Sequence, residues 1–244
     1  MGGALGRRWH AAGFEVHVVE SNEQRRNELT RDGLHCYAAL GDAPAANVTV
    51  LAIKPQQFKP EEFALQDTLA ISIMAGITLA RLSAHSPSTA WVRIMPNLPS
   101  VIGEGMSVAC APNLPSSQRA MVDALFTVVG KIAWVEKENE LHAVTAISGS
   151  GPAYVFAFME ALENAAATLG MDPAFARQLV TQTVKGAALL ADQSTDNTAT
   201  LRRNVTSPAG TTEAALKQFE KLGLSDMVVE ATQAAATRSK ELAE

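Results

Sequence analysis

The sequence has few of the residues that build disulfide, metal or nucleic-acid sites. Its two cysteines, Cys36 and Cys110, lie far apart, and we expect both to be buried thiols in a reducing compartment. The five histidines do not follow the spacing of metal ligands, so no metal site is predicted. The net charge of −5 is not offset by a basic face, which argues against nucleic acid as a partner.

Long apolar runs are also absent. No uninterrupted apolar stretch reaches the length that spans a membrane, and no charged and then apolar leader opens the chain. We therefore expect no membrane partner and a cytoplasmic protein. With 47% hydrophobic and 18% charged residues the chain is not of the disordered class, and 244 residues are enough for two compact domains.

The first half alternates apolar segments with helical patterns. Strands are predicted at residues 15–20, 48–53, 70–74, 90–95 and 106–111. Helices are predicted before Gly13 and over residues 23–32 and 58–65. The alternation predicts an α/β, Rossmann-like domain over residues 1–138, with a doubly wound parallel sheet whose ligands bind where the strands end.

The start of the chain departs from that pattern. The first residues, MGGALGR, run straight into a helix, whereas a strand and the front of a glycine-rich turn normally precede it. Gly2 would be the last glycine of such a turn, where the lack of a side chain lets helix and strand pack closely. A frayed glycine start is the alternative. We expect the first strand to be missing, which would leave two neighbouring strands unpaired near the centre of the sheet.

The ends of two other strands supply candidate cofactor contacts. After residues 15–20, Glu20 offers hydrogen bonds to ribose hydroxyls, whereas Ser21, Asn22 and Arg25 would accommodate a 2′-phosphate. The choice between NAD and NADP therefore stays open, and a solvated strand end followed by a helix N-cap is the alternative reading.

The strand at residues 48–53 contains Ala52 near its end and is followed by Lys54 and Pro55, at the edge where a cofactor would lie. Asn97 stands between two prolines, which stiffen the loop and could position an amide or carbonyl beside a nicotinamide ring. A purely structural loop is the alternative at both places.

The second half, residues 139–244, is predicted to be all helical. Helices are expected over residues 152–169, 173–191 and 212–240, with Gly170 and Gly223 as stops and Asp172-Pro173 as a helix start. These helices are rich in alanine and valine, which would let them pack closely against a second copy. An ordinary monomeric bundle is the alternative.

Two runs of small residues precede helical patterns, TAISGSGPAY at residues 145–154 and VTSPAGTT at residues 205–212. Such a turn before a helix presents unpaired N–H groups and the positive end of the helix dipole, which together bind carboxylates. For either run alone, a well-capped helix is the favoured reading, whereas two such runs in one domain, after an α/β half, favour a ligand site.

Four motifs in order, AIKPQ at residues 52–56, RIMPNLP at residues 93–99 and the two small-residue runs, resemble those of the pyrroline-5-carboxylate reductases. The resemblance extends from Met1 to about residue 235 and is of the bacterial type. It implies reduction of 1-pyrroline-5-carboxylate to L-proline by NADPH or NADH, the last step of proline biosynthesis. It also implies a C-terminal domain that dimerises, giving a homodimer or a higher homo-oligomer.

The resemblance also implies roles for the second run. The substrate carboxylate is expected on the N–H groups of Gly210, Thr211 and Thr212, beside the Ser207 hydroxyl, with Thr212 hydrogen-bonded to the ring nitrogen as the catalytic residue. Ala209 stands where the family has a glycine. If that position requires a positive φ, alanine costs about 1 kcal/mol.

Two other functions stay open at this point. One is a different small Rossmann reductase, such as a 3-hydroxy-acid dehydrogenase, for which Lys185 would be the base, although a solvated helix position is the favoured role for it. The other is a truncated, non-catalytic subunit.

Overall fold

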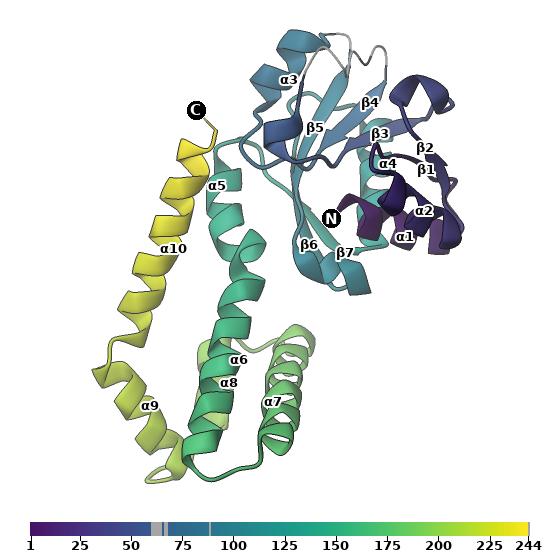
Figure 1. Ribbon diagram of the computed structural model, residues 1–244. Coiled ribbons are helices and arrows are strands. Elements are labelled where there is room, and N and C mark those ends of the chain that lie inside the picture. Colours follow the sequence, from purple (N-terminus) through teal and green to yellow (C-terminus); the bar gives the residue numbers. More distant parts are fainter. Residues whose placement is uncertain (60–64, 66–67, 88, 244) are drawn as a thin grey trace. The chain divides into compact units, whose positions relative to one another are not determined.

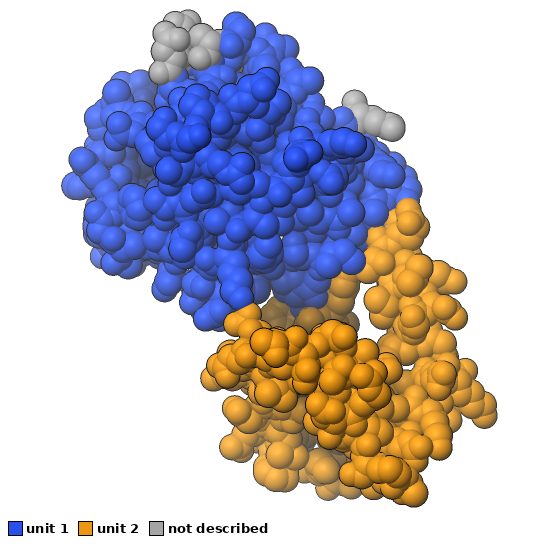
Figure 2. All heavy atoms as spheres, turned by 180° about the vertical axis from the view of Figure 1, so that it is seen from behind, with its two compact units in different colours: residues 1–152, 234–244 blue, residues 153–233 orange. Residues whose placement is uncertain are grey.

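The computed structural model describes residues 1–59, 65, 68–87 and 89–243. It divides into two compact units: unit 1 comprises residues 1–152 and 234–244, and unit 2 comprises residues 153–233 (Figure 2). The domain boundary at residues 138/139 stays a prediction. Each unit is described by itself.

Unit 1 is built on a five-stranded sheet. Its strands lie in the order β3 (Val48–Leu51), β4 (Leu69–Ser72), β5 (Ala90–Met95), β6 (Gly105–Cys110) and β7 (Gly130–Trp134). The first four confirm the apolar segments of the sequence. β7 was not predicted, because its strand is short and carries an exposed lysine, Lys131, at its second position.

The prediction of a parallel sheet was wrong at one pair: β5 and β6 are antiparallel, whereas the other neighbouring pairs are parallel. The physical reason is the length of the connection. Only residues 96–104, which include a short 3-10 helix at Leu98–Ile102, join the two strands. A parallel pair needs a crossover of a dozen or more residues, so this loop permits only the antiparallel arrangement.

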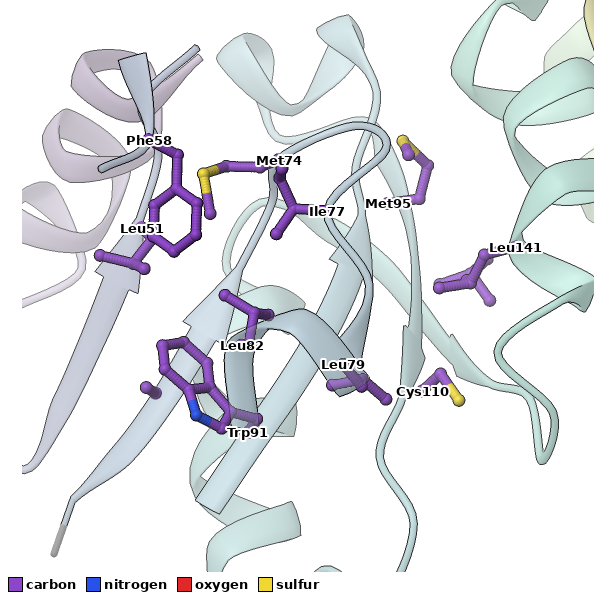
Figure 3. Close-up of a cluster of buried hydrophobic side chains, with 12 residues drawn as sticks. Leu51, Phe58, Met74, Ile77, Leu79, Leu82, Trp91, Met95, Cys110 and Leu141 are labelled. Carbon is purple, nitrogen blue, oxygen red and sulfur yellow. The ribbon is translucent and has the colours of Figure 1, made fainter. Parts of the chain in front are cut away.

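Helices cover both faces of the sheet (Figure 1). On one face α1 (Gly2–Ala11) and α4 (Ser116–Thr127) bury Leu5 and Phe126, and the Trp9 indole donates to the Leu125 carbonyl at 2.7 Å. On the other face α3 (Leu79–His85) and α5 (Glu140–Val144) close a second apolar cluster, which Figure 3 shows. The two-sided burial explains why β4 and β5 are almost continuously apolar.

β1 (His17–Val19) and β2 (His35–Tyr37) form a separate parallel pair, with α2 (Glu23–Arg31) between them in sequence. Among the described residues β1 pairs only with β2, and β3 pairs only with β4. β1 and β3 are therefore the two neighbouring strands that were expected to be unpaired. α1 reaches both sheets, because Gly6 lies against Val18 of β1 and Gly2 lies against Ala52 after β3.

The helix predicted over residues 58–65 falls largely outside the described residues. Before that gap the structure has only two 3-10 turns in this region, η1 (Leu40–Asp42) and η2 (Pro55–Gln57). β2, α3 and α4 were not among the predicted elements.

The helices of the second half are α6 (Gly151–Thr168), α7 (Pro173–Gln193), α8 (Thr198–Asn204), α9 (Thr211–Lys221) and α10 (Leu224–Glu241). α6 begins in unit 1 and α10 ends there, so unit 2 comprises the parts between.

The predicted starts and stops of these helices are confirmed. Gly170 and Gly223 have φ values of +79° and +73°, which glycine adopts without a steric penalty. Asp172 caps α7 by accepting hydrogen bonds from the N–H groups of Ala174 and Phe175, both at 3.0 Å. α8 was not predicted.

Most large apolar side chains of unit 2 are exposed. α6, α8, α9 and α10 contain no buried residue, and α7 buries only Ala176 and Val180. Phe156 is 57% exposed, Phe175 53% and Val229 62%. Exposed apolar surface on this scale marks an interaction surface. No helix of the described part of the chain is long and apolar enough to cross a bilayer.

Candidate functional site

The predicted contacts after β1 lie in a single turn. Asn22 is the N-cap of α2, and its side-chain oxygen accepts the N–H of Arg25 at 2.9 Å. The Glu20 carboxylate accepts the N–H of Asn22, also at 2.9 Å. Ser21 and Arg25 are exposed. The N-cap reading of Asn22 is therefore correct, and contact of this turn with a cofactor stays a prediction.

The structure brings Gly2 and Ala52 together. A Cβ atom built on Gly2 would lie 2.7 Å from the Cβ of Ala52, so any side chain at Gly2 would force the start of α1 away from the end of β3. α1 begins at Gly2 without a side-chain cap, which leaves its first N–H groups without intrahelical partners. A helix start of this kind, held at a strand end, fits the diphosphate of a dinucleotide.

Lys54 and Pro55 follow Ala52 at the same strand end. Lys54 is exposed and is the N-cap of η2, and its carbonyl accepts the N–H of Gln57 at 2.8 Å. Pro55 is the first residue of that turn. The loop is therefore locally ordered, and a role for both residues in cofactor binding stays a prediction.

Asn97 is buried, with 8% of its surface exposed. Its Nδ2 donates to the Ser148 carbonyl at 3.0 Å, and its Oδ1 accepts the N–H of Met106 at 2.8 Å. The structure thus joins the loop after β5 to the run at residues 145–154. Whether Asn97 also touches a cofactor stays a prediction.

The run at residues 145–154 differs from the turn expected there. Thr145–Gly149 forms a π-helix between α5 and α6, in which the N–H of Ser150 donates to the Thr145 carbonyl at 2.8 Å. The hydroxyls of Thr145 and Ser148 donate to carbonyls of the preceding turn. The prediction of an open, anion-binding helix start was wrong here, because the chain continues as helix and uses these hydroxyls itself.

The run at residues 205–212 does precede a helix. α9 begins at Thr211 with Gly210 as its N-cap and without a side-chain cap. The N–H of Gly210 donates to the Ser207 carbonyl at 3.0 Å, whereas those of Thr211 and Thr212 belong to the first helical turn and have no intrahelical acceptor. Thr212 and Ser207 are exposed.

Ala209 has φ +57°, the left-handed conformation for which the sequence suggested a glycine. Its N–H donates to Oε2 of Glu213 at 2.7 Å, and Oε1 of Glu213 pairs with Lys217 at 3.1 Å. Lys217, and then the Ala209 N–H, lower the pKa of Glu213. Sequence reasoning missed Glu213, although its position three residues after the N-cap is the spacing of a capping box.

Four further side chains lie outside these motifs. Lys185 is an exposed residue of α7. His142 shares a hydrogen bond with the Ser239 hydroxyl at 3.0 Å. Cys110 is buried, and burial followed by the charge of Glu138 raises the pKa of its thiol. Cys36 is only half-buried, contrary to the prediction, because β2 belongs to the two-stranded pair outside the five-stranded sheet. Among the described residues no cluster of histidine, cysteine and acidic side chains could hold a metal ion.

Comparison with known proteins gives consistent matches. The family model described as pyrroline-5-carboxylate reductase dimerisation matches residues 138–242. A pyrroline-5-carboxylate reductase of Vibrio alginolyticus is 42% identical over 237 residues, which are 93% of this chain and 87% of that protein. The Haemophilus influenzae reductase is 41% identical over 237 residues, which are 93% of this chain and 88% of that protein.

Solved structures agree. A pyrroline-5-carboxylate reductase from Coxiella burnetii superposes with a TM-score of 0.91 at 32% identity, covering 99% of this chain and 94% of that one. The Plasmodium falciparum pyrroline carboxylate reductase with NADP bound gives a TM-score of 0.86 at 29% identity, covering 100% and 95%.

Fold and comparisons define a protein with a Rossmann-like domain followed by a helical dimerisation domain. The chain belongs to the pyrroline-5-carboxylate reductase family.

Proposed function

We propose that this chain catalyses the reduction of 1-pyrroline-5-carboxylate to L-proline with NADPH or NADH, the last step of proline biosynthesis. The observation that carries the proposal is the 41–42% identity to reductases of that name over 93% of the chain. The uncapped helix start after residues 205–210 supports it, since the substrate carries a carboxylate.

When bound, the nicotinamide cofactor supplies a hydride to the C=N carbon. Seven residues are proposed to hold it, namely Gly2, Ser21, Asn22, Arg25, Ala52, Lys54 and Pro55, with the loop that contains Asn97 beside the nicotinamide ring. The close approach of Gly2 to Ala52 supports a diphosphate position at the start of α1. The relative that is solved with NADP bound supports the cofactor class.

The substrate carboxylate is proposed to lie on the N–H groups of Thr211 and Thr212, beside the Ser207 hydroxyl. Gly210 shapes this turn through its bond to the Ser207 carbonyl, so its own N–H is shared. Thr212 is proposed to orient the ring nitrogen and to relay a proton from water to it, because a threonine hydroxyl is too weak an acid to protonate the nitrogen alone. One hydride on carbon and one proton on nitrogen complete the reduction.

The chain forms a homo-oligomer, a homodimer or a larger assembly. We propose that its subunits are joined by the exposed apolar side chains of unit 2. The helical domain is proposed to begin at residue 139. Both cysteines are free thiols, which supports a reducing compartment, the cytoplasm. Light scattering on the full chain should give at least twice the chain mass. Phe156→Glu should lower it, whereas Ile102→Glu in unit 1 should not.

The activity is tested by incubating the purified full chain with racemic 1-pyrroline-5-carboxylate and NADPH or NADH and quantifying proline. We expect proline in an amount equal to the cofactor oxidised. Cofactor titration by fluorescence is the companion measurement. Tight cofactor binding without proline would favour a different reductase, and the absence of both would favour a non-catalytic subunit.

A further inference from the structure

The segment between α5 and α6 contains a carbonyl, that of Ser148, which lacks its α-helical donor. In an α-helix the Ser148 carbonyl would accept the N–H of residue 152, but that residue is proline, which has no N–H. A proline ring also clashes with the carbonyl four residues before it. The π-helix at Thr145–Gly149 widens the helix at this place, which is how the chain accommodates Pro152.

Asn97 supplies the missing donor. Its Nδ2 lies 3.0 Å from the Ser148 carbonyl, while its Oδ1 accepts the N–H of Met106 at 2.8 Å. These two partners fix the orientation of the amide, because a carbonyl needs the NH₂ group and an N–H needs the oxygen. Asn97 is 8% exposed, so water would not replace either bond without cost. Pro96 and Pro99 stiffen the backbone on both sides.

We propose that Asn97 is a positioning residue, which holds the π-helix at Thr145–Gly149 in register with the end of β5 and so fixes the run Ser148–Pro152. The kinetic consequence rests on the proposed reductase function, in which the loop that contains Asn97 lies beside the nicotinamide ring and is bonded to this run through Ser148. Met95, the last residue of β5, lies against Gly149 and gives the second contact between the same two elements. A shift of the π-helix would therefore change the geometry of hydride transfer more than the binding of either reactant.

Asn97→Asp tests the donor separately. The new carboxylate keeps the acceptor for Met106 but cannot donate to Ser148 until it is protonated. At neutral pH we expect kcat to fall about tenfold or more, with smaller changes in KM for NADPH and for the imine. As the pH falls, the ratio of variant to wild-type kcat should rise, because the protonated carboxyl regains a donor. Asn113→Asp makes the same change at an exposed loop residue and should leave kcat unchanged.

Hydrogen–deuterium exchange gives a readout that needs no activity. Exchange within residues 145–152 should be faster in Asn97→Asp than in wild type and unchanged in Asn113→Asp. If the wild-type chain makes no proline, the proposed function fails, while exchange still decides the role of Asn97. The proposal would be overturned if residues 145–152 of Asn97→Asp exchanged at the wild-type rate. It would also be overturned if the kcat of Asn97→Asp did not recover at low pH.

A second variant covers the case in which Asn97→Asp folds poorly. Pro152→Ala gives residue 152 an N–H that can pair with the Ser148 carbonyl. In that background Asn97→Asp should lower the melting temperature less than it does in the wild-type chain. An equal loss in both backgrounds would mean that the bond to Ser148 is not what Asn97 contributes.

Discussion

The turn before α9 depends on the backbone conformation of one residue, Ala209, whose φ is +57°. We predict that Ala209→Gly raises the free energy of unfolding by about 1 kcal/mol, because the left-handed conformation penalises a Cβ atom. Ala214→Gly, five residues on and inside α9, is the matched control and should lower it by about the same amount. Chemical denaturation measures both. A loss of stability in Ala209→Gly would show that the strain lies elsewhere.

Thr212 is the second residue whose role can be isolated. Thr212→Val keeps the shape of the side chain and removes the hydroxyl proposed to face the ring nitrogen. We predict a kcat decrease corresponding to about 2–4 kcal/mol, with an unchanged circular dichroism spectrum, and partial recovery in Thr212→Ser. Steady-state kinetics with racemic substrate measures it. Wild-type turnover in Thr212→Val would remove this residue from the mechanism.

At the scale of elements, the end of α10 is held on unit 1 by the bond between His142 and Ser239. Burial, and then the charges of Arg93 and Lys240, lower the pKa of His142 from its ordinary 6.5, against a smaller opposing effect of Glu138 and Ser239. The unfolded chain therefore binds this proton more tightly than the folded chain does. Stability contributed by neutral His142 is present above pH 6.5 and is lost as the pH falls through the lower folded pKa.

We predict that His142→Asn, which can keep a hydrogen bond to Ser239, loses less stability than wild type as the pH falls below 6.5. His85→Asn, at an exposed residue of α3, is the matched control and should leave the wild-type pH dependence unchanged. Urea unfolding across that pH range measures the slope. Equal slopes in wild type and His142→Asn would contradict this account.

The elements show what a single sequence can predict. β3, β4 and β5 are short, nearly continuous apolar runs, and Asp172 and Gly223 are local signals, so all of these were found. β2 has only three residues and carries a histidine, and β7 is half-buried, so neither has a periodic signal. The antiparallel β6 follows from a loop length, and the π-helix from a proline whose missing N–H affects the residue four positions before it. Neither effect changes the periodicity of apolar residues, so a search for periodic patterns does not find it.

The candidate site was predicted less completely for the same reason. The helix start at Thr211 is a local signal and was found, but the partners of Asn97 come from β6 and from the α5–α6 helix. Ser148 lies 51 positions and Met106 9 positions from Asn97, so the sequence around Asn97 does not indicate either partner.

At the scale of the whole molecule, the separation of the β1–β2 pair from the five-stranded sheet is the main structural peculiarity. β1 and β3 each present an edge without a partner among the described residues. We predict that extending the chain at its N-terminus by about ten residues of apolar strand and glycine turn raises both the melting temperature and the affinity for NADPH. A scrambled extension of equal composition is the control. Equal values in the extended chain and the chain as it stands would show that the cofactor site is built without such a strand.

The most direct test of the central claim is to follow the hydride. The full chain is supplied with 1-pyrroline-5-carboxylate and with NADPH deuterated at the transferable position of its ring, and the proline formed is analysed by NMR and mass spectrometry. The account predicts one deuterium per proline, located at C5, the carbon of the former C=N bond. Proline without deuterium, deuterium at another carbon, or no proline from a chain that binds NADPH would contradict it.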